Sequence, residues 1–288
     1  MLVAEVWLAT LTKNSDDAGT GAGKLNLTVN IGGEDVLDND FEFMGGSGIL
    51  SGGLGPDSGW LDQGQAALTS PAKLTTPLES AQLTPSSIRL GIRDDDAWGP
   101  DSVLVLGTSI DPKTEGQVIP LAMETNLQHW LSTDSSEGKL TMPIRTVTLG
   151  SSATVIQRVL LLVYTGSGDS KTDSPIQLQV TAGGNLVLDQ TVTDTPQDDL
   201  EAYTANWYPL SAAVPFTLLD VRLNGGIRLN ILGDDAWLPS TLFLYGLDTA
   251  EGRPNEVVPL VTVRNWNLGT LSTDPQEGSA SIDLPVVH

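Results

Sequence analysis

The sequence has no cysteine, which excludes disulfide bonds, zinc–thiolate sites and thiol nucleophiles together. Histidine is nearly as scarce, since the chain holds only His129 and His288. Aromatic residues make up 5% of the chain, and the Leu-, Lys- and Glu-rich stretches of helical proteins are missing. These shortages leave few groups for acid–base catalysis and point away from a helical fold.

Positive charge is scarce as well, because 14 lysines and arginines face 36 aspartates and glutamates, for a formal net charge of −22. A field of this sign repels nucleic acid and bare anionic membranes and attracts cations. We therefore expect no nucleic-acid partner. An anionic membrane would have to be reached through a bridging cation.

The first residues, Met1–Leu8, lack the basic start and long apolar run of a secretory signal. We predict a strand there. The protein is expected either to begin in the cytoplasm or to be exported after removal of a signal that preceded this numbering. The compartment stays open on these grounds.

A long internal repeat is the most informative feature that the chain does contain. Residues 88–100 (IRLGIRDDDAWGP) return 139 positions later as residues 227–239 (IRLNILGDDAWLP), and 10 of 20 positions are identical when both segments are extended to the next glycine. A second block, LSTD followed by EG, begins at Leu131 and again at Leu271. This period is too long for a solenoid, so each copy is predicted to be a whole domain. We expect domains at 1–144 and 154–288, joined by a linker at 145–153.

Within each copy the apolar residues follow the period of a β-strand. Lys24–Ile31 and Ile176–Val180 alternate, whereas Ser102–Leu106 and Thr241–Tyr245 are more uniformly apolar, as in strands covered on both faces. We expect seven or eight strands per copy and no amphipathic helix, so two sheets must cover each other. The predicted fold is all-β, with two tandem antiparallel β-sandwich domains related by internal duplication.

These residues resemble the PLAT/LH2 family of β-sandwich domains. The family pattern of a strand ending in Thr-Gly, a loop and an alternating strand is matched by Tyr164–Gly166 and Thr172–Leu178. Its later Ile-Arg-Ile-Gly strand, acidic loop and Pro are similar to residues 88–100. One departure concerns tryptophan, which the family carries just after that Pro but which stands before it here, as Trp98 and Trp237.

The resemblance implies a calcium site in each copy, because in calcium-binding members the loop after the first strand and the Asp-rich loop lie at the same end of the sandwich. Calcium takes six to eight oxygen ligands, which such converging loops can supply. The ligands implied are Asp169, Thr172, Asp173, Asp234 and Asp235 in the second copy, and Asp16, Asp17, Thr20, Asp94, Asp95 and Asp96 in the first. The competing interpretation is that these aspartates cap turns and face water.

Trp98 and Trp237 each follow a run of acids and precede a turn Pro, which predicts a position near a loop tip. Such a ring either folds back to cover the end of the sandwich or is presented as an anchor for a membrane or partner. Both interpretations stay open, with coverage slightly favoured.

No catalytic residue is assigned. His129 lies in a loop without any nucleophile-elbow sequence nearby, and no Gly-rich loop precedes a Lys-Ser/Thr pair. We expect a non-enzymatic recognition module that binds a lipid surface or a protein partner, assisted by calcium. The alternative is a structural component, such as a filament, shell or toxin subunit, that self-associates without calcium. Carbohydrate binding is a third and weaker alternative, since it needs a flat row of aromatic residues and the chain has only four Tyr and seven Trp.

Overall fold

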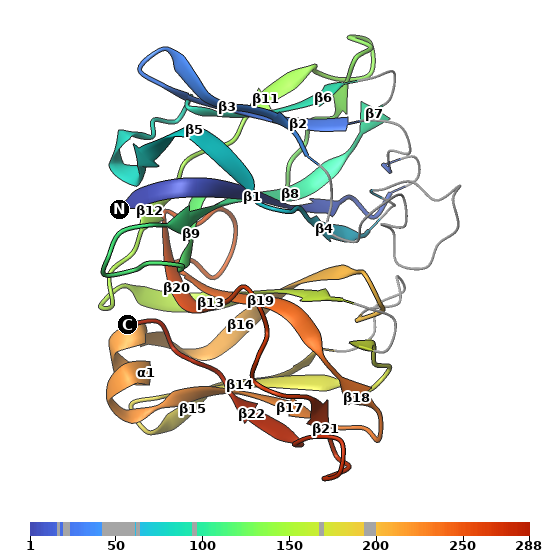
Figure 1. The fold of residues 1–288 in the computed structure, drawn as a ribbon, viewed down its shortest axis with the longest axis vertical. Coiled ribbons are helices and arrows are strands. Elements are labelled where there is room, and N and C mark those ends of the chain that lie inside the picture. Colours follow the sequence, from blue (N-terminus) through green and yellow to red (C-terminus); the bar gives the residue numbers. More distant parts are fainter. Residues whose placement is uncertain are drawn as a thin grey trace. The chain divides into compact units, whose positions relative to one another are not determined.

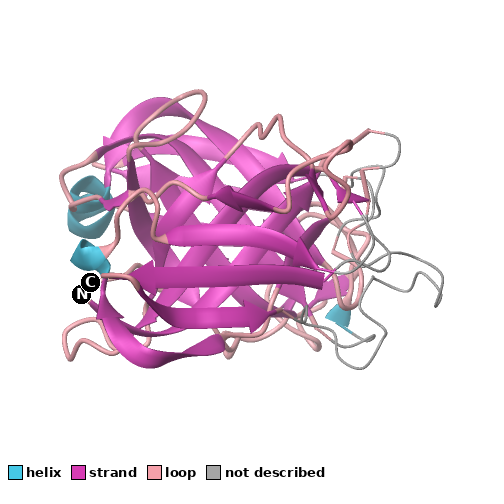
Figure 2. Ribbon diagram, turned by 90° about the horizontal axis from the view of Figure 1, so that it is seen from above, coloured by secondary structure: helices cyan, strands magenta, loops and turns pink. Residues whose placement is uncertain are grey.

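A computed structural model describes residues 1–15, 18–19, 24–41, 61, 64–93, 97–166, 170–192 and 200–288. The chain divides into two compact units, Met1–Thr148 and Leu149–His288. Strands predominate in the described residues, in several mainly antiparallel sheets (Figure 2). Their helices are too short to cross a membrane.

The strands of unit 1 run from the N-terminus to the junction (Figure 1). They are β1 (Leu2–Thr12), β2 (Lys24–Ile31), β3 (Glu34–Asp40), β4 (Ala66–Leu68), β5 (Ala72–Glu79), β6 (Ile88–Arg93), β7 (Ala97–Trp98), β8 (Pro100–Ser109), β9 (Val118–Glu124), β10 (Leu131–Ser132) and β11 (Thr141–Pro143). The 3-10 helix η1 (Ser80–Gln82) follows β5. A further short strand, β12 (Thr148–Leu149), lies at the junction of the two units.

Two sheets and a small ribbon make up unit 1. In the first sheet β1 pairs with β4 and β5 on one side and with β8 on the other, and β9 pairs with β8. The second sheet has the order β11-β6-β2-β3, and β7 pairs with β10. Alternate residues of β2 (Leu25, Leu27 and Val29) are buried, so the alternation predicted for this strand reports one-sided burial.

Unit 2 has a similar order of elements, but the strand β16 and the helix α1 stand where unit 1 has β4, β5 and η1. Its strands are β13 (Val155–Thr165), β14 (Ile176–Ala182), β15 (Asn185–Val192), β16 (Ala205–Thr217), β17 (Gly226–Ile231), β18 (Ala236–Trp237), β19 (Pro239–Leu247), β20 (Glu256–Val263), β21 (Leu271–Ser272) and β22 (Ser281–Asp283), and its helix is α1 (Leu218–Asn224).

In unit 2, β13 pairs with β16 and β19, β19 pairs with β20, and the second sheet has the order β15-β14-β17-β22. One hydrophobic cluster collects alternate residues of both sheets, for example Leu161 of β13, Leu178 of β14 and Leu229 of β17. Burial of these side chains is the main source of stability for such a unit.

The hairpins that open the second sheets use the same turn. Gly32 and Gly33 join β2 to β3 with φ of 61° and 94°, and Gly183 and Gly184 join β14 to β15 with φ of 57° and 79°. A two-residue hairpin loop with positive φ at both positions suits glycine, because a side chain is strained there.

The structure differs from the sequence-based expectation in two respects. The short α1 was not expected; it begins at Thr217, whose side chain and that of Asp220 cap each other's backbone N–H groups, and it buries Leu218 and Val221. The described strands also exceed seven or eight per copy, because pieces of two or three residues such as β7 and β10 pair separately.

Candidate functional site

Both repeated tryptophans lie inside their units. Trp98 is 0% exposed and Trp237 is 1% exposed, and the indole Nε1 of each donates a hydrogen bond to a threonine hydroxyl, Thr12 at 3.0 Å and Thr165 at 3.1 Å. A membrane or partner anchor needs an exposed ring, which neither residue offers. The burial of Trp98 and Trp237 therefore favours a covered position over the anchor role.

The second repeated block, which begins at Leu131 and at Leu271, forms a loop that starts beside the tryptophan of each unit. Leu131 pairs with Trp98, and Leu271 pairs with Trp237. After Leu271 the Ser272 hydroxyl donates to Glu277, and the Asp274 carbonyl accepts the N–H groups of Glu277 and Gly278. The same bonds occur in the loop of unit 1. These repeated residues thus stabilise the same loop in both units.

At the loop end of unit 2 the structure brings two of the implied calcium ligands together. The backbone N–H of Asp173 donates to the carboxylate of Asp235, 62 positions away, over 3.3 Å. The N–H of Asp235 in turn donates to the Ser174 hydroxyl over 3.1 Å. The loop between β13 and β14 therefore meets the loop between β17 and β18.

The remaining implied ligands of unit 2 differ in position. Asp234 is exposed in the same loop as Asp235, whereas Thr172 is buried and its hydroxyl accepts the N–H of Ser174. Asp169 lies outside the described residues. Among the residues that are described, no group of three or more Asp, Glu or His side chains is arranged to hold a metal ion.

The ligands implied for unit 1 all lie outside the described residues; they are Asp16, Asp17, Thr20, Asp94, Asp95 and Asp96. Their neighbours are described. The N–H of Gly99 donates to the carbonyl of Ala18 over 2.9 Å, and the N–H of Lys13 donates to the carbonyl of Gly99 over 2.9 Å. The chain segments next to the two acidic stretches are thus joined at one end of unit 1.

Two leucines at the loop end of unit 2 were missed by the sequence analysis. Leu232 is 52% exposed and Leu238 is 39% exposed, and they stand on either side of Asp234 and Asp235. Their backbone N–H groups donate to the carbonyls of Pro175 and Ser170, so both belong to the joined loops. The repeat could have drawn attention to these leucines, because the residues aligned with them in the first copy, Arg93 and Gly99, are not apolar side chains of similar size.

The two histidines are both exposed. A scan against models of protein families, a search of curated proteins and a search of solved structures found no match to this chain.

Proposed function

We propose that this chain is a non-enzymatic recognition protein that binds calcium at the loop end of unit 2 and, through the bound calcium, a lipid surface. The observation that carries the proposal is the hydrogen bond of 3.3 Å from the backbone N–H of Asp173 to the carboxylate of Asp235. Two exposed leucines, Leu232 and Leu238, flank Asp235 in the sequence. Calcium binding and lipid binding are each inferred from several of these residues together.

The architecture that we propose is a pair of duplicated β-sandwiches of PLAT/LH2-like type. The similar order of strand pairing in the two units supports duplication. The two-glycine turns after β2 and β14 support it too. So do the loops in which the carbonyls of Asp134 and Asp274 accept the same pair of backbone N–H groups. The hydrophobic cluster that draws on both sheets of unit 2 supports the sandwich.

The residues at this loop end are of the kind that ligate a hard cation, although in this structure their carboxylates are not gathered around one point. The carboxylates of Asp173, Asp234 and Asp235 are exposed, which leaves room for water and backbone carbonyls to complete a shell of six to eight oxygens. A bound cation also offsets the repulsion between neighbouring carboxylates. We keep Thr172 out of this ligand set, because its buried hydroxyl already serves the turn.

The two leucines cannot hold the protein on a membrane by themselves. Full burial of such a side chain contributes about 1.5–3 kcal/mol, and Leu232 and Leu238 have about half of their surface left to bury. The pair therefore contributes about 1.5–3 kcal/mol, less than the ~4 kcal/mol of a millimolar complex. A chain of net charge −22 needs the cation to approach an anionic surface.

Co-sedimentation with vesicles tests this proposal. We expect binding to phosphatidylcholine–phosphatidylserine vesicles in calcium, no binding in EDTA or magnesium, and loss of binding in the D173N/D235N variant. The matched control E34Q/E115Q removes the same charge from exposed positions of unit 1 and should bind like the parent protein. Binding that persists in EDTA, or that both double variants lose equally, would contradict the proposal.

A second candidate function is self-association, and α1 favours it. Leu219 and Leu223 of this helix are exposed, the latter by 75%, and Val155 beside the helix start is exposed too. Figure 1 shows α1 and β18 at opposite ends of unit 2, so this apolar surface is separate from the calcium loops. Sedimentation velocity over a concentration series in EDTA would detect it, and L219E/L223E should abolish the association.

A further inference from the structure

A polar hollow on the second sheet of unit 1 has no role in the function proposed above. It measures about 400 Å³ and lies over β2, β6 and β11. The side chains of Asn26, Thr28 and Asn30 line it, in alternation with the leucines and valine of β2 that are buried. The hollow therefore occupies the face of the sheet turned away from the core, and its volume lies within the usual range of small-molecule sites.

Arg89 is the only cationic side chain that lines this hollow, and it is exposed. Its neighbours across the sheet are Thr28 on β2 and Pro143 on β11, neither of which carries charge. Among the residues that the structure describes, none forms a hydrogen bond or ion pair with the side chain of Arg89. Five N–H donors in a planar fork are thus left for solvent or for a ligand.

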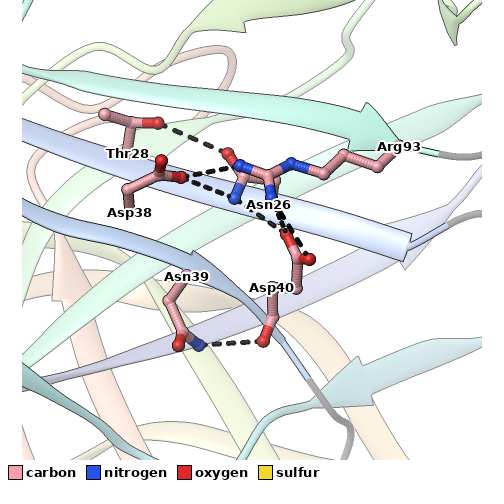
Figure 3. A network of polar contacts seen from close by, with 6 residues as sticks. All are labelled: Asn26, Thr28, Asp38, Asn39, Asp40 and Arg93. Carbon is pink, nitrogen blue, oxygen red and sulfur yellow. Dashed lines mark hydrogen bonds and ion pairs between the residues drawn. The ribbon is translucent and has the colours of Figure 1, made fainter.

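The other arginines in comparable positions are neutralised. Arg93, four residues further along β6, pairs with Asp38 over 2.9 Å and with Asp40 over 3.2 Å, as Figure 3 shows. In unit 2 the residue aligned with Arg89 is Arg228, which pairs with Asp283 over 2.7 Å. Pro143 stands where Asp283 does in the pairing of strands. The chain has 36 acidic residues, yet the Arg89 guanidinium has no carboxylate partner in the described part.

The rest of the lining suits a hydroxyl-rich ligand. Asn30 and Asp35 share a hydrogen bond of 2.8 Å, which leaves further lone pairs on the carboxylate as acceptors. Ser86 and Thr141 add exposed hydroxyls. Because Asp35 balances Arg89, the lining carries no net charge, which disfavours a dianion such as phosphate and admits a ligand with one negative charge.

We propose that this hollow binds an acidic sugar, with Arg89 holding the carboxylate of a uronic acid in a two-bond fork and the amide, hydroxyl and carboxylate groups around it holding the sugar hydroxyls. Arginine and carboxylate match in geometry as well as in charge. Aromatic stacking, which many sugar sites use, has no counterpart in this lining, so we expect a dissociation constant in the range of about 1 mM. The uronate can be free or part of an oligosaccharide, since the hollow is open to solvent.

Titration of the isotope-labelled full chain, followed by two-dimensional NMR in EDTA, tests the inference. The probes are D-glucuronate, a glucuronate-containing disaccharide, D-glucose, acetate and inorganic phosphate. We expect both uronates to shift resonances of unit 1 and to bind at least about tenfold more tightly than glucose, acetate or phosphate. The disaccharide will bind more tightly than the monomer if the natural source is an oligosaccharide.

Variants assign the binding to Arg89. R89Q should weaken glucuronate binding at least about tenfold, which corresponds to 1.4 kcal/mol. R228Q is the matched control, because its guanidinium is already held by Asp283, and it should bind like the parent protein. If R89Q does not fold, R89K replaces it; it keeps the charge but not the fork, so binding should weaken several-fold.

Three results would overturn the inference. The first is no response to glucuronate at about 50 mM. The second is an equal response to glucuronate, acetate and phosphate, which would indicate unspecific anion binding. The third is an equal effect of R89Q and R228Q. Since EDTA removes calcium and no vesicles are present, failure here leaves the calcium and lipid proposal untouched.

Discussion

The indole nitrogen of Trp237 donates a hydrogen bond to the hydroxyl of Thr165 over 3.1 Å, although 72 positions separate the two residues. Thr165 ends β13, the first strand of unit 2, and Trp237 ends the two-residue strand β18. Trp98 and Thr12 are related in the same way in unit 1, over 3.0 Å. The contact therefore ties the short strand β7 or β18 to the end of the first strand of its unit.

This relationship predicts the effect of removing the hydroxyl. In T165V the buried indole N–H loses its acceptor, and an unsatisfied buried donor costs about 1–3 kcal/mol. T165S keeps the oxygen and should remain within about 1 kcal/mol of the parent protein. Urea titration followed by circular dichroism measures both free energies of unfolding. Equal stability of the two variants would show that the hydrogen bond contributes nothing.

The ring itself should contribute more than its hydrogen bond. We expect W98A and W237A to lower the free energy of unfolding by about 3–5 kcal/mol each, as is usual for a large buried aromatic. Guanidinium titration of each unit's transition measures this, and acrylamide quenching of single-Trp variants gives the exposure independently. A loss below about 1 kcal/mol would mark an exposed residue and restore the anchor interpretation.

The sequence predicts strands well where one face is buried, because alternation then records the burial residue by residue. Lys24–Ile31 was predicted as a strand, and β2 has these same bounds. The sequence could not decide whether the ring of Trp237 is buried or exposed, since the neighbouring residues are compatible with both. The choice depends on Thr165, a residue distant in the sequence.

Other features escaped prediction for different physical reasons. The helix α1 has only seven residues, too few for a periodic apolar pattern to stand out, and its capping residues Thr217 and Asp220 are common in loops too. Leu232 and Leu238 are single apolar residues in a loop, which normally need no explanation. Only their replacement by Arg93 and Gly99 in the other copy makes them informative.

That replacement defines a precise test of the lipid contact. In the L232R/L238G variant, each leucine is exchanged for the residue that aligns with it in the first copy. We expect calcium to raise the melting temperature as in the parent protein, by mass action on the folded state, while calcium-dependent vesicle binding is lost. Differential scanning calorimetry and co-sedimentation separate the two effects. Vesicle binding at the parental level would exclude the leucines from the lipid contact.

The cap of α1 provides a prediction that is independent of any ligand. The Thr217 hydroxyl accepts the N–H of Asp220 over 3.1 Å, and the Asp220 carboxylate accepts the N–H of Thr217 over 3.2 Å. T217A should therefore lower the free energy of unfolding by about 0.5–2 kcal/mol, whereas T217S should retain most of it. Urea titration checks the pair, and an unchanged midpoint in T217A would mean that packing alone holds the helix.

Stability should also fall at high pH because of Tyr164. This residue is 7% exposed, and its burial, together with the nearby Tyr203, raises the pKa of its phenol from 10.0 to about 12. The folded state thus binds the phenolic proton more tightly than the unfolded state. The resulting stabilisation is complete below pH 10 and is lost progressively as the pH rises from 10 towards 12.

The variant Y164F removes the titrating group and keeps the ring. We expect the urea midpoint of the parent protein to fall between pH 10.0 and about pH 12, the window set by the two pKa values, and that of Y164F to fall less steeply. Tyr245 is fully buried and its pKa is raised by that burial, so Y164F should reduce the slope without abolishing it. Y203F serves as the control, because Tyr203 only modulates the effect of burial. Parallel midpoint curves for the parent protein and Y164F would mean that the Tyr164 phenol ionises equally in the folded and unfolded chains.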